Sequence, residues 1–126
     1  MKLSTFLTVR SIVALAYALT LLFIPGLMLS LYGMTPGPGI NLMSQFVGVE
    51  LIAFGLVCLN ARNFVDSTIL RPILTSFLIA EAVGVLVAIY GTLSGAMNTL
   101  GWSIVLIYGL FSLGYVYFLF VKKVSD

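Results

Sequence analysis

The sequence predicts an all-α, polytopic membrane protein, a bundle of four transmembrane helices. Of its 126 residues, 61% are hydrophobic and 8% are charged, and the mean hydropathy is +1.19. Soluble domains are usually about 45–50% apolar and about 25% charged, and a small domain still exposes a large share of its surface. We therefore expect lipid to be the solvent for most of a single transmembrane domain that covers residues 1–126.

Four apolar runs reach the length of about 20 residues that a membrane-spanning helix needs. A stretch rich in Gly and Pro follows the first run, and a polar, charged stretch follows the second. Within the first run, Pro25-Gly26 predicts a kink or an early helix end, because proline lacks a backbone N–H and crowds the preceding turn. The expected helices cover residues 11–32, 41–60, 72–92 and 101–121.

The basic residues predict the orientation of the four helices. They lie before the first run, between the second and third, or after the fourth, whereas the two opposite loops carry no charge. By the positive-inside rule, this distribution places both termini in the cytoplasm, and we expect the inner (cytoplasmic) membrane of a bacterium. The six basic residues are Lys2, Arg10, Arg62, Arg71, Lys122 and Lys123.

The composition also excludes several classes of function. A single cysteine, Cys58, cannot form an intramolecular disulfide, and a chain without histidine has neither His-based metal sites nor a histidine general base. The basic residues form no patch of the kind that binds nucleic acid. Because no nucleotide-binding loop or Ser-based triad is recognisable, we expect no cofactor, and the sequence leaves open whether the chain is an enzyme.

Two glutamates, Glu50 and Glu81, stand in the middle of the second and third apolar runs. A carboxylate at the centre of a bilayer costs about 2.5–3.5 kcal/mol on insertion scales and usually faces a bundle interior. Each lies nine residues into its expected helix, a rise of about 13 Å, so we expect both at nearly the same depth. Because we expect no basic residue at that depth, we predict a buried and neutral pair.

Hydroxyl groups on the other two helices are expected to complete the hydrogen bonds of this pair. Tyr108 and Ser112 are four residues apart on one face of the fourth helix, and Tyr17 and Thr20 are three apart on the first. Such a cluster could hold the helices together, handle protons or cations, or bind a ligand. The predicted buried polar cluster consists of Glu50, Glu81, Tyr108, Ser112, Thr20 and Tyr17.

Short motifs resemble the DoxX-like superfamily of small four-helix membrane proteins. They are Phe23-Ile24-Pro25-Gly26 in the first run, and Gly48-Val49-Glu50-Leu51 followed by Phe54-Gly55-Leu56 in the second. The resemblance implies a membrane subunit, tied in some members to quinone or thiol redox systems, and it carries over Glu50 as a site residue. The single cysteine departs from the redox-active members, so we do not expect thiol chemistry.

These observations support three hypotheses about function. The first, which we favour, is an accessory or structural subunit of a larger membrane complex, stabilised by its neutral Glu pair. The second is a homo-oligomeric, proton-coupled transporter or channel that uses Glu50 and Glu81. The third is a membrane-embedded binder or enzyme for a quinone or lipid-like substrate. The expected partners are the lipid bilayer, other membrane subunits or a second copy of the chain, and no nucleic acid.

Overall fold

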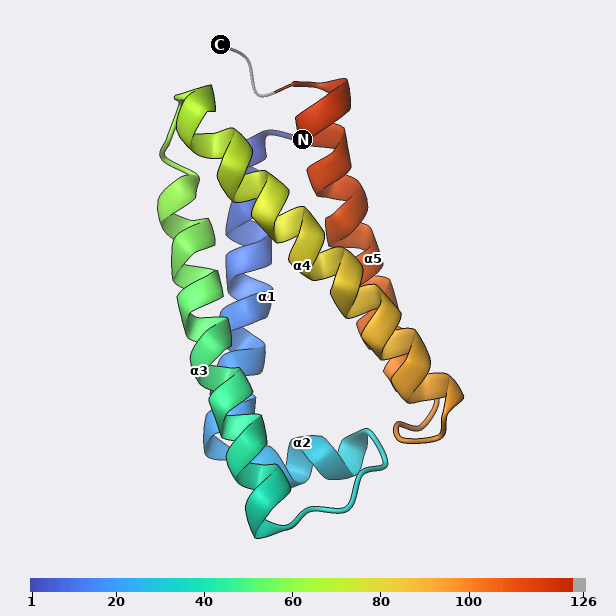
Figure 1. Cartoon of the computed structure of the whole chain (residues 1–126). Helices are drawn as coiled ribbons and strands as arrows, with labels where there is room; N and C mark the ends of the chain where they lie inside the picture. The colour runs from blue at the N-terminus through green and yellow to red at the C-terminus, as the bar shows by residue number, and fades with distance from the viewer. Residues whose placement is uncertain (124–126) are drawn as a thin grey trace. The chain divides into compact units, whose positions relative to one another are not determined.

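The computed structural model describes residues 1–123, which fold into helices (Figure 1). Within this range, four spans are long and apolar enough to cross a membrane: α1, α3, α4, and α5 together with the π-helix that continues it. The all-α class and the four apolar spans are therefore confirmed. In chain order, the elements are α1 (Leu3–Phe23), α2 (Pro25–Leu31), α3 (Pro38–Ala61), α4 (Ser67–Leu93), α5 (Gly101–Val116) and η1 (Tyr117–Val121).

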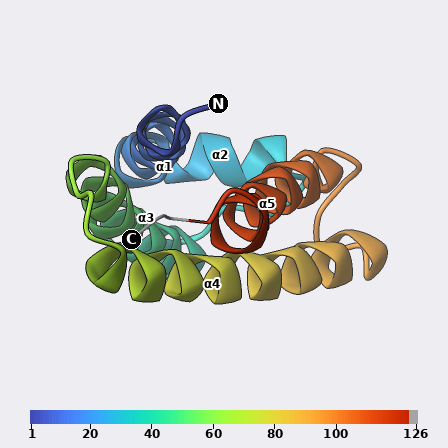
Figure 2. The same ribbon diagram turned by 90° about the horizontal axis from the view of Figure 1, so that it is seen from above.

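The chain divides into two compact units, Met1–Arg62 and Asn63–Asp126. In the first unit, α1 and α3 run antiparallel as a hairpin, and α2 lies across one end of it (Figure 1). In the second unit, α4 and α5 lie side by side and are also antiparallel (Figure 2). Each unit is therefore a pair of apolar helices with its own packing surface.

The first span begins and ends earlier in the sequence than expected. The helix α1 covers Leu3–Phe23 instead of residues 11–32, and the chain breaks at Ile24, where φ is −134° and ψ is 51°. Pro25 then occupies the first position of α2, where its missing N–H is tolerated. The early helix end predicted from Pro25 is confirmed, and the seven-residue α2 is too short to span a bilayer.

The earlier start of the first span places Arg10 inside it. We expected Arg10 ahead of the first helix, but it is the eighth residue of α1 and is buried. Its guanidinium carbon lies 4.4 Å from the centroid of the Phe54 ring on α3, and the quadrupole of such a ring attracts a cation. The expected position of Arg10 was therefore wrong, because the apolar side chains of Phe6 and Leu7 extend the helix toward the N-terminus.

The third span also begins earlier than expected, at Ser67 instead of residue 72. Asp66 caps the helix: its carboxylate accepts hydrogen bonds from the backbone N–H of Thr68 at 2.8 Å and from its hydroxyl at 2.7 Å. Pro72 therefore lies inside α4 and does not begin it.

Two glycines allow α3 to approach α1 closely. A Cβ atom at Gly48 would lie 3.1 Å from the backbone oxygen of Ala18, and one at Gly55 would lie 2.8 Å from Cγ of Leu15. The two glycines are seven residues apart and so share one face of α3. Small residues at such contacts are typical of helix packing in membranes, where close approach maximises van der Waals contact.

Candidate functional site

Glu50 lies in the middle of α3, at least eleven residues from either end, and is exposed. The phase of the helix explains this exposure. Gly48 and Gly55 face α1, whereas Glu50, two residues after Gly48, is rotated by about 200° from it. The carboxylate is therefore on the face of α3 opposite α1, and the prediction of a buried pair was wrong for Glu50.

Glu81, in contrast, is only 1% exposed. It lies on the face of α4 that packs against α5 in the second unit. Four residues before it, the Phe77 ring lies 5.8 Å from the Tyr115 ring, measured between centroids. Three residues after it, a Cβ atom at Gly84 would lie 3.0 Å from the ring of Tyr108. The expected burial therefore holds for Glu81.

These contacts also fix the antiparallel register of α4 and α5, because seven residues forward on α4 correspond to seven residues back on α5. Glu81 is therefore level with residues 111–112. Ser112 lies between Tyr108 and Tyr115 on the face of α5 turned toward α4. Its Oγ atom is buried and forms no hydrogen bond within the part of the chain that the structure describes. Glu81 is therefore opposite the face of α5 that carries Tyr108 and Ser112. That these three residues form one polar cluster stays a prediction.

Tyr17 and Thr20 belong to the first unit, where each has a hydrogen bond of its own. The hydroxyl oxygen of Tyr17 lies 3.0 Å from that of Tyr32, just after α2. The hydroxyl of Thr20 donates a hydrogen bond of 2.8 Å to the carbonyl oxygen of Tyr17 on the same helix, a common arrangement for threonine inside helices. That these two residues join the glutamates in one cluster stays a prediction.

Gln45 joins α3 to the end of α1. Its side-chain amide donates a hydrogen bond of 3.1 Å to the carbonyl oxygen of Leu22. Leu22 belongs to the last turn of α1, where carbonyl groups lose their partners in the helix. The helix break at Pro25 was the signal in the sequence, because a break inside an apolar region leaves backbone acceptors that a neighbouring polar side chain must satisfy.

Metal-ligating side chains are scattered in the described part of the chain. Across residues 1–123, no three His, Cys, Asp or Glu side chains gather into a group that could hold one. The thiol of Cys58 is buried in the first unit. Such burial is ordinary for cysteine, which is among the most buried residue types in proteins.

No protein-family model matches the chain, and no curated protein or solved structure shows significant similarity to it. The resemblance to the DoxX-like superfamily therefore rests on the four-helix layout and the short motifs. The structure establishes a small integral membrane protein with four apolar spans.

Proposed function

We propose that the chain is an accessory or structural subunit of a larger membrane complex. The observation that supports this proposal is the exposure of Glu50 at the middle of an apolar span. A carboxylate at that depth costs about 2.5–3.5 kcal/mol when it faces lipid, whereas a protein partner can supply hydrogen bonds to it. A contact with another protein inside the bilayer therefore accounts for Glu50 better than a lipid-facing position does.

The basic residues support an orientation with both termini in the cytoplasm. In the first unit, Arg62 at the end of α3 donates a hydrogen bond of 3.2 Å to the hydroxyl of Thr8 near the start of α1. In the second unit, Lys122 follows η1 with its ammonium group 5.9 Å from the Phe118 ring centroid. Each hairpin thus carries exposed positive charge at the end that holds its first and last residues, and the positive-inside rule assigns that end to the cytoplasm.

The resemblance to the DoxX-like superfamily agrees with a membrane subunit. Its second motif, which runs from Gly48 to Leu56, can be explained by the packing of α3. Within this motif, Gly48 and Gly55 form the contact with α1, while Glu50 points to the opposite side. One short segment thus combines a surface for packing inside the chain with a polar group available to a partner. The bacterial inner membrane is the location that we propose.

Purification of the tagged chain from its native membranes tests this proposal. We expect the 13.6 kDa chain to co-purify in a fixed ratio with at least one other membrane protein. Glu50→Leu should weaken that association, whereas Val49→Leu, a change at the neighbouring residue that is 50% exposed, should not. A wild-type chain that purifies alone, or only as a homodimer, would contradict the accessory role.

The burial of Glu81 favours proton-coupled transport as a second candidate function. A carboxyl group level with the Ser112 hydroxyl in an apolar span resembles the groups that take up and release protons in transporters. Glutamine keeps the shape of glutamate but cannot titrate. If Glu81→Gln and Glu50→Gln leave both stability and the phenotype of the host unchanged, proton handling is excluded. Lost activity at unchanged stability would instead favour transport.

A further inference from the structure

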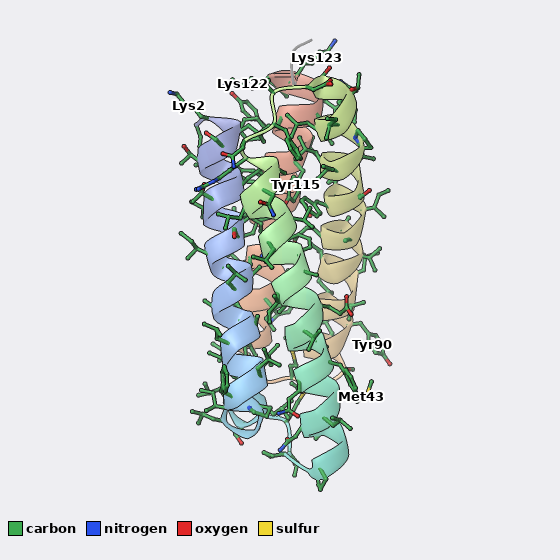
Figure 3. All side chains as sticks on the ribbon, turned by 90° about the vertical axis from the view of Figure 1, so that its left-hand side faces the viewer. Lys2, Met43, Tyr90, Tyr115, Lys122 and Lys123 are labelled. Atoms are coloured by element: carbon green, nitrogen blue, oxygen red, sulfur yellow. The ribbon has the colours of Figure 1, made fainter. Side chains whose placement is uncertain are left out.

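The short helix α2 lies at the end of the first unit where α1 stops and α3 begins, and it packs against both. Because α1 and α3 are antiparallel apolar spans, that end must lie at one surface of the bilayer. Figure 1 shows α2 running across the hairpin there, whereas Lys2 lies at the opposite end (Figure 3). The connectivity of the first unit therefore brings α2 to the boundary between the acyl chains and the headgroups.

The length of α1 explains why the chain changes direction at Ile24. A helix rises about 1.5 Å per residue, so the 21 residues of α1 cover about 32 Å, close to the hydrocarbon thickness of about 30 Å. A straight helix from Leu3 to Leu31 would rise about 44 Å and carry its last turns out of the hydrocarbon. The break at Ile24 instead turns the next seven residues across the hairpin.

A hydrogen bond between two tyrosines holds the far end of α2 against α1. The hydroxyl oxygens of Tyr17 and Tyr32 lie 3.0 Å apart, and Tyr32, directly after α2, is only 8% exposed. If α2 continued the axis of α1, residues 17 and 32 would be about 22 Å apart along the helix, too far for their side chains to meet. The bond therefore forms only when α2 is folded back against the hairpin.

Both ends of α2 are closed by local backbone structure. Pro25 occupies its first position, and Gly33, with a φ of 78°, follows its last turn. The N–H of Met34 donates a hydrogen bond of 2.9 Å to the carbonyl oxygen of Leu29, and that of Gly33 donates one of 3.0 Å two residues before Tyr32, to Ser30. This pair of bonds is a Schellman motif, which ends a helix at a glycine. The helix α2 is therefore a separate element and not a frayed end of α1.

The two sides of α2 differ in exposure. Leu29 is 4% exposed and packs into the first unit, whereas Leu27 and Leu31, 56% and 51% exposed, lie four residues apart on the opposite side. A helix at a membrane surface buries such an apolar side at the boundary between headgroups and acyl chains. Phospholipid at that boundary is the partner that the position of α2 provides.

We propose that α2 is an interfacial anchor. It lies in the plane of the membrane with Leu27 and Leu31 inserted among phospholipids at the boundary, and the hydrogen bond between Tyr17 and Tyr32 holds it there. The anchor concerns the first unit alone and does not depend on the accessory role, so its tests use the chain without any other protein.

Tryptophan fluorescence in phosphatidylcholine vesicles tests the depth of α2. Trp102→Phe removes the single tryptophan of the chain; in that background, Leu27→Trp places a fluorophore on α2, and Ile12→Trp places one in the middle of α1. The wild-type residues are similarly exposed, 56% and 62%, and any preference of tryptophan for the interface acts on both variants. We expect a nitroxide near the headgroup to quench Leu27→Trp more than one near the end of the acyl chain, and the reverse order for Ile12→Trp.

Two results would overturn the anchor. Stronger quenching of Leu27→Trp by the deep nitroxide would place α2 inside the hydrocarbon core. Quenching of Leu27→Trp by aqueous iodide, with no effect of either nitroxide lipid, would place it in water.

Hydrogen exchange in the same vesicles tests the bond between the tyrosines. Tyr17→Phe and Tyr32→Phe each keep the ring and remove one hydroxyl, so the backbone amides of α2 should exchange about 2- to 13-fold faster, the factor that corresponds to one hydrogen bond. Tyr90→Phe is the matched control, because Tyr90 projects away from α4 in the second unit and is 75% exposed (Figure 3). Equal exchange of α2 in all three variants would show that the bond does not hold the anchor in place.

Discussion

The hydroxyl of Ser11 donates a hydrogen bond of 2.8 Å to the carbonyl oxygen of Gly55 and so joins α1 to α3. The bond is possible because residue 55 has no side chain: a Cβ atom there would lie within 2.9 Å of Leu15. Apolar helices gain little from burying apolar surface when their surroundings are lipid, so close packing and interhelical hydrogen bonds hold them together. The first unit uses both at the same place.

Replacement of Ser11 by Ala should destabilise the first hairpin. We expect a loss of about 0.5–1.5 kcal/mol, the net value of one hydrogen bond, measured by unfolding in detergent. Ser44→Ala is a matched control, because the hydroxyl of Ser44 donates its hydrogen bond to the carbonyl oxygen of Ile40 on the same helix. Equal effects of the two substitutions would mean that the bond between the helices contributes nothing particular to stability.

In the second unit, Gly84→Ala should destabilise the contact between α4 and α5. The added Cβ atom would lie 3.0 Å from the Tyr108 ring, and overpacking of this kind costs about 1–3 kcal/mol. Gly109→Ala is the control: a Cβ atom at that position meets nothing within 4 Å, and alanine favours the helix by about 0.5–1 kcal/mol. The midpoint temperature of thermal unfolding should therefore fall for Gly84→Ala and rise for Gly109→Ala. A shift in the same direction for both variants would contradict the register of α4 against α5.

The ends and faces of the helices were harder to predict than the spans. Apolar runs of about 20 residues identify spans because the thickness of the bilayer dictates their length. The first and third helices begin before the expected residues 11 and 72. The apolar residues ahead of Arg10 extend α1, and the cap at Asp66 lets α4 begin five residues before Pro72.

Counting along the sequence predicts where each glutamate lies along its own helix, but the surroundings of each depend on which face of that helix packs. Glu81 shares its stripe with Gly84, which contacts α5, and it is buried. Glu50 is near Gly48 in sequence but lies on the opposite face, and it is exposed. A sequence shows both stripes without showing which of them the neighbouring helix covers.

Gln45→Leu should destabilise the break between α1 and α2, because it removes the hydrogen bond to the Leu22 carbonyl oxygen. We expect a loss of about 1–3 kcal/mol, the cost of an unsatisfied buried acceptor. Pro25→Ala restores a backbone N–H and lets α1 continue, which gives the last carbonyl groups of α1 partners within the helix. In that background, Gln45→Leu should therefore lower the stability by less. A double-mutant cycle measures this coupling. Strictly additive losses of stability would show that Gln45 does not stabilise the chain where α1 ends.

Acid should weaken the start of α4. The hydrogen bonds from the Thr68 hydroxyl and backbone N–H hold the pKa of the Asp66 carboxyl below its ordinary value of 3.8. A carboxyl group whose pKa is lower in the folded protein stabilises it fully above the ordinary value, and the benefit disappears as the pH falls through the lowered pKa. Asp66→Asn keeps a capping oxygen that does not titrate.

The difference in unfolding midpoint between wild type and Asp66→Asn should therefore shrink between about pH 6 and about pH 2.5. The two proteins differ only at residue 66, so the comparison isolates the effect of its carboxyl group. A difference that stays constant over this range would contradict the cap assigned to Asp66.

The central claim is that protein, and not lipid, covers Glu50 within the bilayer. The most direct test is the protein mass of the particle extracted from native membranes into lipid nanodiscs. Our account predicts a wild-type particle well above the 13.6 kDa of one chain, a lighter particle for Glu50→Leu, and no change for Val49→Leu. A wild-type chain extracted singly, with the same protein mass as the Glu50→Leu variant, would contradict it.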